Sequence, residues 1–279
     1  MNMSFKIKLI IAKIFDIFGM NLLLSKFINL KYKNNYIRLV NYHFSPVAEK
    51  ENFEKQVQWF LKEYENCDYK KFCDFLDGKY KFSKKPGIMF TFDDGFLENY
   101  EVAYPMLKKY NATGYYMVSS GLIGATNHVN EVGVVHDYMG EEALKEMLRD
   151  GHVIGCHTFS HHRMNINDSE EVLKHEIIES KQKLENILGE EIQIFCWCGG
   201  EEHTYTKAAA DVIRNAGYKY GFMTNSSPLT VNTNRFQIDR VNVEASWPMS
   251  LVRFQVSGFI DYKLRKKRNR VQTLTGSII

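Results

Sequence analysis

The chain has 279 residues, of which 44% are hydrophobic, 14% aromatic and 25% charged. This composition can build a sizeable core and excludes an intrinsically disordered protein. The net charge of +3 is ordinary, so we expect no nucleic-acid partner. The length suits one α/β domain of barrel size, and no linker rich in proline, glycine or serine divides the sequence.

Residues 1–35 are predicted to form an N-terminal amphipathic helical segment. Residues 9–24 are strongly apolar, but Lys13 and Asp16 interrupt them, and a membrane span needs about 20 mostly apolar residues. No small-residue cleavage site follows, so we expect no secretory signal peptide and a location in the cytoplasm or at the cytoplasmic face of the membrane. Two interpretations stay open: a helix lying on an anionic membrane surface, or a terminal helix packed on the domain.

Short apolar runs and helix-like segments alternate from residue 36 to residue 243. Strands are predicted at 36–42, 87–92, 114–118, 152–156, 191–195, 218–223 and 236–243. Helices are predicted at 51–64, 99–110, 141–149, 169–188 and 206–215. This alternation predicts βαβ units and a parallel sheet, and its repetition favours a barrel over an open sheet. A basic cluster at 263–270 indicates a C-terminal tail at 261–279, either solvated or in contact with an anionic membrane.

Two carboxylates directly follow the predicted strand at 87–92. Asp93 and Asp94 stand in the run Thr-Phe-Asp-Asp-Gly at 91–95. Because sites in parallel α/β proteins form at the carboxyl ends of strands, such a pair can divide the roles of metal ligand and general base. The alternative is an ordinary Asp-Asp-Gly turn.

Three of the nine histidines lie within six residues after the predicted strand at 152–156. His157 and His161 are four residues apart, a spacing that places two imidazoles on one face of a helical turn, where they can share a metal. With one aspartate they give a ligand set that leaves positions open for water and substrate. This set suits zinc, and nickel, cobalt or iron would also fit. A surface histidine cluster is the alternative interpretation.

These two runs resemble the first two motifs of the NodB-homology polysaccharide deacetylases, carbohydrate esterase family 4. The Thr-Phe-Asp-Asp-Gly motif matches 91–95 without change, and the His-Ser/Thr-x-x-His motif matches 157–161. The resemblance implies a distorted (β/α) barrel, here at residues 36–260, that removes N-acetyl groups from a carbohydrate, with bacterial surface polysaccharide synthesis or modification as the setting. It also implies that Asp94, His157 and His161 bind the metal and that Asp93 is the general base.

The general acid is not at the usual place of this family, a histidine near the C-terminal end of the domain. This chain has no histidine after His203. However, Asn41-Tyr42-His43 ends the first predicted strand and resembles the Tyr-His of the circularly permuted members that act on poly-N-acetylglucosamine. That resemblance implies His43 as the general acid. A structural histidine at a strand end is the alternative.

The third family motif, Arg-x-Pro-Tyr, is also altered. The corresponding run at 195–200 reads Phe-Cys-Trp-Cys-Gly-Gly, so Cys196 replaces the arginine that normally steadies the base. We predict that Arg240, in the strand at 236–243, supplies this guanidinium to Asp93. Arg163 is a second candidate, and a surface ion pair between Arg240 and Asp239 is the alternative.

The resulting prediction is a metal-dependent carbohydrate N-deacetylase whose partner is an N-acetylated polysaccharide, oligosaccharide or lipid-linked sugar. Alternatives are a catalytically impaired carbohydrate-binding homologue and a deacylase of an O-acetyl or non-sugar amide substrate. Cys198 is a further candidate ligand, although a buried thiol is the simpler interpretation. Four aromatic residues are candidates for stacking on sugar rings, with burial in the core as the alternative: Tyr115, Tyr116, Trp197 and Trp247.

Overall fold

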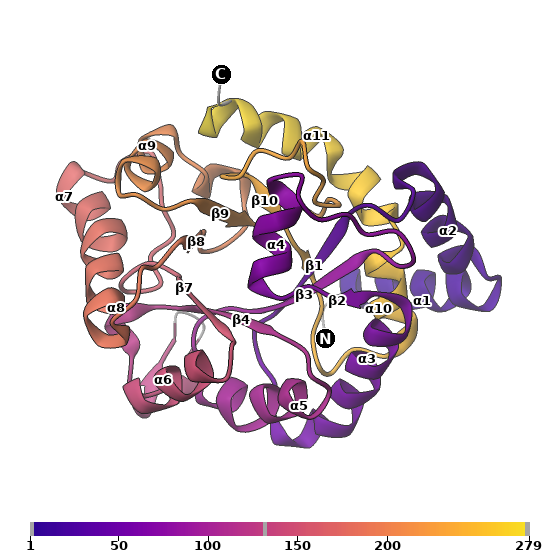
Figure 1. Ribbon diagram of the computed structural model, residues 1–279, viewed down its shortest axis with the longest axis horizontal. Helices are drawn as coiled ribbons and strands as arrows, with labels where there is room; N and C mark the ends of the chain where they lie inside the picture. Colours follow the sequence, from indigo (N-terminus) through magenta and orange to yellow (C-terminus); the bar gives the residue numbers. More distant parts are fainter. Residues whose placement is uncertain (1–2, 131–132, 277–279) are drawn as a thin grey trace.

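A parallel sheet curled into a nearly closed barrel dominates the computed structural model, which describes residues 3–130 and 133–276 (Figure 1). The sheet has nine strands among these residues, in the order β10-β9-β8-β7-β4-β3-β1-β11, and β2 pairs with β3 outside that path. The predicted α/β class and distorted (β/α) barrel are therefore confirmed. The extreme ends of the predicted terminal segments, residues 1–2 and 277–279, lie outside the described residues.

The strands are short, and most of them lie at the positions predicted from the sequence. Their bounds are β1 (Ile37–Tyr42), β2 (Glu65–Asn66), β3 (Gly87–Phe92), β4 (Gly114–Val118), β7 (Val153–Cys156), β8 (Ile194–Cys196), β9 (Tyr220–Met223), β10 (Ile238–Asp239) and β11 (Val241–Asn242). A separate antiparallel hairpin contains β5 (His128–Val129) and β6 (Val135–His136).

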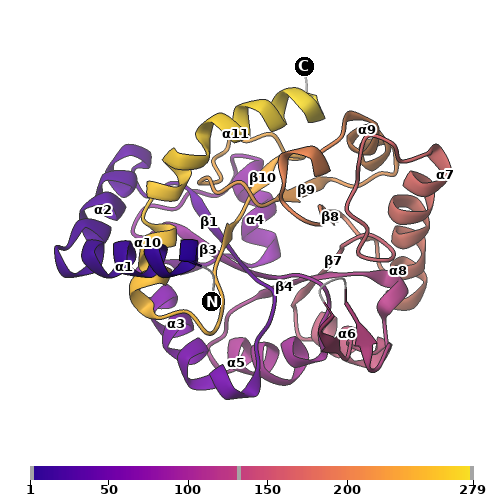
Figure 2. The same cartoon turned by 180° about the vertical axis from the view of Figure 1, so that it is seen from behind.

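Helices surround the barrel and extend from it at both ends of the chain (Figure 2). The α-helices are α1 (Met3–Ile17), α2 (Met20–Tyr32), α3 (Lys50–Glu63), α4 (Tyr69–Leu76), α5 (Tyr104–Lys109), α6 (Glu141–Arg149), α7 (Glu170–Leu173), α8 (Ser180–Leu188), α9 (Lys207–Asn215), α10 (Met249–Val256) and α11 (Phe259–Thr275). Shorter 3₁₀ turns are η1 (Val47–Glu49), η3 (Ser120–Leu122) and η5 (Glu202–Thr204), and π-helical segments are η2 (Asn99–Ala103) and η4 (Lys174–Glu179).

A single extended segment brings the two edges of the sheet together. We predicted one strand at 236–243, but the structure contains two strands, β10 and β11, separated only by Arg240. β10 pairs with β9 at one edge of the sheet and β11 pairs with β1 at the other. The segment changes its hydrogen-bonding partner at Arg240, whose N–H donates to the Met223 carbonyl. The covalent chain therefore closes the barrel at this residue.

Alternation along the strands separates an inner from an outer core. Alternate positions such as Leu39 and Met89 cluster with Phe72 of α4, which lies across one end of the barrel. The intervening positions, such as Val40 and Phe90, belong to a second cluster that includes the surrounding helices. Hydrophobic burial on both faces of the strands explains their nearly continuous apolar sequences.

The inner series becomes polar towards the carboxyl ends of the strands. Asn41, Thr91, Asp93 and Arg240 continue the alternation of the inner apolar positions, and all four are buried. Buried polar groups of this kind must satisfy one another. Because α4 covers the opposite end of the barrel, the polar layer lies at the end where the loops after the strands meet.

Both ends of the described part of the chain are helical and packed. α1 lies beside α10, so the prediction of a terminal helix packed on the domain describes one of its faces. Most of the segment expected to be a basic tail lies instead in α11. Asp261 near its start is buried and accepts hydrogen bonds from Arg38 (2.9 Å) and Ser226 (2.6 Å), and these contacts hold the helix against the barrel.

Candidate functional site

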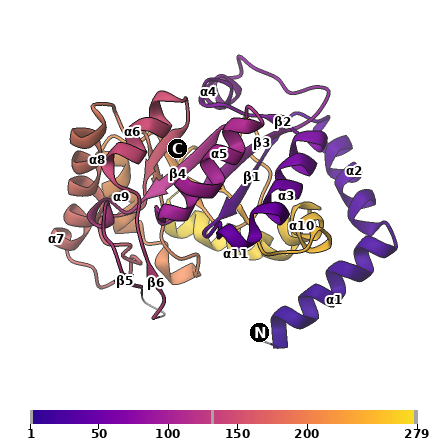
Figure 3. The ribbon, with the colours of Figure 1, turned by 90° about the horizontal axis from the view of Figure 1, so that it is seen from below.

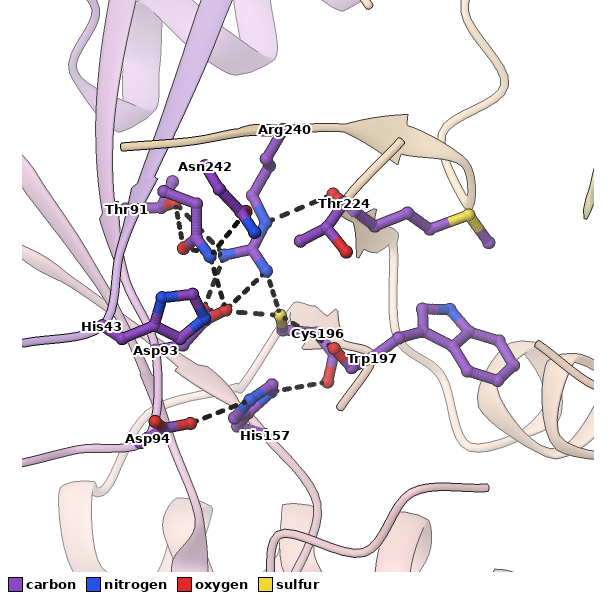
Figure 4. A network of polar contacts seen from close by, with 12 residues as sticks. His43, Thr91, Asp93, Asp94, His157, Cys196, Trp197, Thr224, Arg240 and Asn242 are labelled. Carbon is purple, nitrogen blue, oxygen red and sulfur yellow. Dashed lines mark hydrogen bonds and ion pairs between the residues drawn. The ribbon is translucent and has the colours of Figure 1, made fainter. Parts of the chain in front are cut away.

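Five of the six predicted site residues line one cavity at the carboxyl end of the barrel, and Figure 4 shows the polar contacts around most of them. The cavity has a volume of about 590 Å³, within the range of small-molecule sites. Its wall includes His43 after β1, Asp93 and Asp94 after β3, and His157 and His161 after β7. Residues that are far apart in the sequence thus meet because parallel strands end at the same edge of the sheet.

Three residues in the loops that carry the predicted metal ligands have unusual backbone conformations. Asp94, Thr158 and His161 have φ values of 74°, 63° and 63°, in the left-handed region that side chains rarely adopt. A β-branched threonine there is strained, and such strain persists where surrounding contacts hold it. The Thr158 hydroxyl accepts from the His162 N–H (2.9 Å), and the Thr158 carbonyl accepts from the Ser120 N–H (3.1 Å).

Glu176, in the π-helical segment η4, holds the histidine loop from outside the cavity. Its buried carboxylate accepts hydrogen bonds from the backbone N–H groups of Phe159 and Ser160, each at 2.9 Å, and from the Ser160 hydroxyl at 2.7 Å. The sequence analysis missed this residue, because no local pattern relates residue 176 to the loop at 158–161. Glu176 is a positioning residue for His157 and His161.

Asp94, His157 and His161 form the predicted trio. The Oδ1 atom of Asp94 lies 3.3 Å from His157 Nε2 and 3.1 Å from His161 Nε2. Burial would raise the pKa of Asp94, but its contacts with the two imidazoles and nearby positive charge hold it well below the usual range. The carboxylate is therefore ionised at neutral pH, as a metal ligand must be.

The orientation of His157 makes this trio fit a cation. Its Nδ1 lies 3.0 Å from the backbone carbonyl oxygen of Cys196, which can only accept, so Nδ1 carries the proton. Its Nε2 then faces Asp94 Oδ1, a buried oxygen that makes no hydrogen bond to any described residue. A cation held by Asp94, His157 and His161 would supply positive charge at this point.

Asp93 is held by a fully buried ion pair. Arg240 donates to both carboxylate oxygens, with Nη1 at 2.6 Å from Oδ1 and Nη2 at 2.8 Å from Oδ2. Asn41 donates a third hydrogen bond at 2.9 Å. Burial would raise the pKa of Asp93, but the guanidinium outweighs it and lowers the pKa below its usual value. An ion pair between Arg240 and Asp239 at the surface, the alternative considered from the sequence, is contradicted by the complete burial of Arg240.

Cys196 occupies the position where the family motif has arginine, and it lies in the same network. Arg240 Nη2 is 2.8 Å from the Cys196 sulfur, which is in turn 3.6 Å from Asp93 Oδ1. Burial raises the pKa of this thiol well above its usual value, so it stays neutral. The Arg240 guanidinium, at the junction of β10 and β11, thus reaches the Asp93 carboxylate beside the small, uncharged side chain of Cys196. The other candidate, Arg163, lines the cavity and pairs with Glu201 at 3.2 Å.

His43 lies at the mouth of the cavity, with about 38% of its side chain exposed. Its Nδ1 is 2.9 Å from Glu244, which follows β11 and was not identified from the sequence. Burial would lower the pKa of His43, but Glu244 and the two aspartates outweigh it and raise the pKa to about 9. Glu244 could have been proposed as a site residue from the sequence, because it directly follows the predicted strand at 236–243.

The remaining candidates are divided between the cavity and the core. Three of the four proposed stacking aromatics, Tyr115, Tyr116 and Trp197, are buried in the core, whereas Phe96 and Tyr138 line the cavity. The potential donor atoms of Cys198, His157 and His161 lie within 4.8 Å of one another, so the structure leaves Cys198 open as a ligand. Burial raises the pKa of the Cys198 thiol well above its usual value, which favours a neutral thiol. The roles of all these residues remain predictions.

Comparison with known sequences points to one family. A model of the family described as polysaccharide deacetylase matches residues 81–221, half of the chain. A poly-beta-1,6-N-acetyl-D-glucosamine N-deacetylase of Staphylococcus aureus (strain MRSA252) is 30% identical over 76% of this chain and 80% of its own length. A putative polysaccharide deacetylase of Bacillus subtilis (strain 168), YxkH, is 28% identical over 70% of this chain, which spans 64% of that relative's length.

Solved structures share the fold. The Streptococcus pyogenes deacetylase PplD, in complex with acetate, superposes with a TM-score of 0.64 and 22% identity, covering 80% of this chain and 97% of its own. IcaB from Ammonifex degensii gives a TM-score of 0.65 and 20% identity, covering 81% and 97%. These likenesses confirm the barrel architecture.

Proposed function

We propose that this chain, which belongs to the polysaccharide deacetylase family, hydrolyses the N-acetyl groups of a carbohydrate with the help of a bound metal. The family is metal-dependent, and its members are carbohydrate de-N-acetylases, hydrolases of carbon–nitrogen bonds. One observation carries the proposal for this chain: Asp93, the Asp94–His157–His161 trio and His43 line a single cavity, while Arg240 and Glu244 hold Asp93 and His43 from behind its wall.

The residues divide the chemistry between them. Asp93 accepts the proton of the attacking water, and Arg240 keeps it ionised until then. His43, protonated at neutral pH beside Glu244, donates a proton to the leaving amine. A metal held by Asp94, His157 and His161 would supply positive charge that polarises the acetyl carbonyl.

The negative charge that develops on the acetyl oxygen also needs a hydrogen-bond donor. Gly199 lines the cavity with φ of 82°, and a side chain there would meet the Glu201 carboxylate at 2.8 Å. The run that corresponds to the third motif thus places a glycine at the cavity wall, where the motif has tyrosine. We expect the backbone N–H near Gly199 to serve the oxyanion.

The metal and the substrate follow from the donor set and the relatives. Two imidazoles and a carboxylate suit zinc, with nickel, cobalt or iron as alternatives. The name of the S. aureus relative supports an N-acetylglucosamine polymer as the substrate. A lipid-linked or free oligosaccharide of similar chemistry is the alternative. We place the activity in the synthesis or modification of a bacterial surface polysaccharide.

A catalytically impaired binding homologue was the main alternative, because the third motif lacks its arginine. The buried contact between Arg240 and Asp93 removes that reason, since a guanidinium reaches the base from another strand. A protein that only binds sugar also needs no buried, ionised carboxylate next to a metal trio. A deacylase of O-acetyl groups or of a non-sugar amide uses the same chemistry and is distinguished by its substrate.

Metal removal tests the proposal. Chelator treatment should abolish acetate release from N-acetylglucosamine oligomers, and zinc should restore it, because the carbonyl loses its polarising charge with the metal. The variant His157→Ala, treated in the same way, should not recover. Release that withstands complete metal removal would contradict metal dependence, and release only from an O-acetylated glycan would replace the amide substrate with an ester.

A further inference from the structure

Helices α1 and α2 expose an apolar surface along their outer side. More than half of the exposed large hydrophobic side chains in the described part of the chain lie within residues 3–30. Nine of these twelve side chains recur at steps of three and four residues, the period of one helix face. On α1 and α2 respectively they are Met3, Ile7, Ile10, Ile14 and Ile17, and Met20, Leu23, Phe27 and Leu30.

The opposite face of α1 is already occupied by the domain. Phe5 contacts Trp247 with ring centroids 5.9 Å apart, and Phe15 contacts Phe254 at 5.1 Å. Ala12 is fully buried in the same cluster. The outer face is therefore not what holds α1 in place, and the helix is apolar on both sides. A helix of this kind in a soluble setting needs a second apolar partner.

The charges around this surface are almost all positive. Residues 3–33 contain six lysines and one acidic residue, Asp16. Asp16 is neutralised by Arg253, with N–O contacts of 2.5 and 2.7 Å. The exposed lysines that border the apolar stripes are Lys6, Lys13, Lys26 and Lys31. A second copy of the chain docked on this face would bring like charges together, whereas anionic lipid headgroups complement them.

We propose that residues 3–33 form an arm that docks the protein on the surface of an anionic bilayer. The apolar stripes of α1 and α2 enter the boundary between headgroups and acyl chains, about 5–10 Å deep, and the lysines reach back to the lipid phosphates. None of the described helices is both long and apolar enough to cross a membrane, so the arm lies along the surface.

The start of α11 adds basic groups next to this arm. Lys263, Arg265 and Lys266 are exposed there, and Tyr262 beside them is 71% exposed. Phe15 of α1 contacts Phe259 of α11 with ring centroids 5.5 Å apart. Burial, and then the charge of Lys263, lowers the pKa of Lys8. The two basic regions of the sequence are therefore neighbours in space, as a common anionic partner requires.

The arm is also connected to the catalytic end of the barrel. Trp247, which packs on Phe5 and lies under Lys8 at 4.8 Å, is three residues from Glu244, the partner of His43. Figure 3 shows the N-terminal end of α1 projecting beyond the same end of the barrel as the β5–β6 hairpin. Docking would hold the cavity close to the membrane, where a lipid-linked glycan is found.

Vesicle flotation of the full chain tests the proposal directly. The chain should float with vesicles of phosphatidylcholine and phosphatidylglycerol, bind phosphatidylcholine alone far less, and dissociate as salt rises. Lys6→Gln with Lys13→Gln should weaken binding about 30-fold, at ~1 kcal/mol for each lysine. Ile10→Ser with Phe27→Ser should weaken it at least about tenfold, because apolar surface no longer enters the bilayer.

A matched control removes apolar side chains that are equally exposed but lie elsewhere. Ile166 and Val47 are 85% and 67% exposed, and Ile166→Ser with Val47→Ser should leave binding unchanged. Thermal unfolding of every variant should match the parent, which separates lost docking from lost folding. Binding that is indifferent to the arm variants, or no binding to anionic vesicles, would overturn the proposal. A dimer in light scattering that Ile10→Ser with Phe27→Ser dissociates, without vesicle binding, would assign the surface to a second copy instead.

Discussion

At the scale of single residues, the site is a set of charges whose ionisation is fixed by their neighbours. Arg240 and Asn41 hold Asp93 as a carboxylate, and the Cys196 carbonyl fixes the proton of His157 on Nδ1. Glu244 holds His43 in its protonated form. A base that is ionised and an acid that is protonated at the same pH are what amide hydrolysis requires.

The pH dependence of Glu244→Gln tests the role of His43. Loss of the carboxylate lowers the pKa of His43 from about 9, because the imidazolium loses its charged partner. Since the acid must be protonated, activity falls as pH rises through this pKa, and the variant should lose activity at lower pH than the parent. Profiles of kcat/KM against pH measure this. The control is Glu202→Gln, whose carboxylate pairs with Arg270 at the surface; an alkaline limb that stays in place in Glu244→Gln would remove His43 as the acid.

At the scale of elements, the junction between β10 and β11 combines two tasks. The chain passes there from one edge of the sheet to the other, and the side chain at the junction, Arg240, enters the polar layer inside the barrel. The sequence predicted a strand around Arg240 but not its division, because both halves are extended and only their hydrogen-bonding partners differ. Closure of the barrel and support of Asp93 therefore depend on the same short segment.

Replacement of Arg240 should cost stability as well as turnover. In Arg240→Met the Asp93 carboxylate stays buried without its partner, so the free energy of unfolding should fall by about 3–5 kcal/mol. Arg235→Met is the matched control, because Arg235 is partly exposed and pairs with Asp77 at the surface, where an ion pair contributes less than about 1 kcal/mol. Denaturant unfolding measures both variants.

The double variant Asp93→Asn with Arg240→Met separates the ion pair from the packing of the side chain. It should recover part of the lost stability, because no unpaired charge is left in the barrel. Metal affinity should change little in Arg240→Met, since no ligand is removed. A loss of stability no greater than that of Arg235→Met would contradict a buried, structural ion pair.

At the scale of the whole molecule, the sequence predicted the repeated alternation of strands and helices well. Periodicity and strand-end motifs placed β1, β3, β4, β7 and β9, and with them five of the six predicted site residues, at one end of a barrel. Residues 99–110 and 169–188 were expected as continuous helices, whereas π-helical segments interrupt both patterns. The helices α4, α10 and α11 were missed: α4 and α10 have only eight residues each, and the basic run in α11 was interpreted as a tail.

Contacts between segments that are not adjacent in the chain could not be predicted from the sequence. Glu176 contacts Ser160, which lies 16 residues earlier in the chain. Glu244 contacts His43, which lies 201 residues earlier. No spacing rule connects such positions, and only the closed barrel brings them together. Family resemblance, in contrast, identified the motif residues because those lie in two short runs.

The most direct test of the account is acetate release from N-acetylglucosamine oligomers by the metal-loaded chain and by Asp93→Asn. The account predicts release by the parent and a loss of at least about 100-fold in the variant, because a general base contributes 10²–10⁴-fold to such reactions. Metal content and thermal unfolding of both proteins establish that the variant is folded and loaded. Equal release by the two proteins would contradict the role of Asp93, and no release by the loaded parent from any N-acetylated glycan would contradict the deacetylase itself.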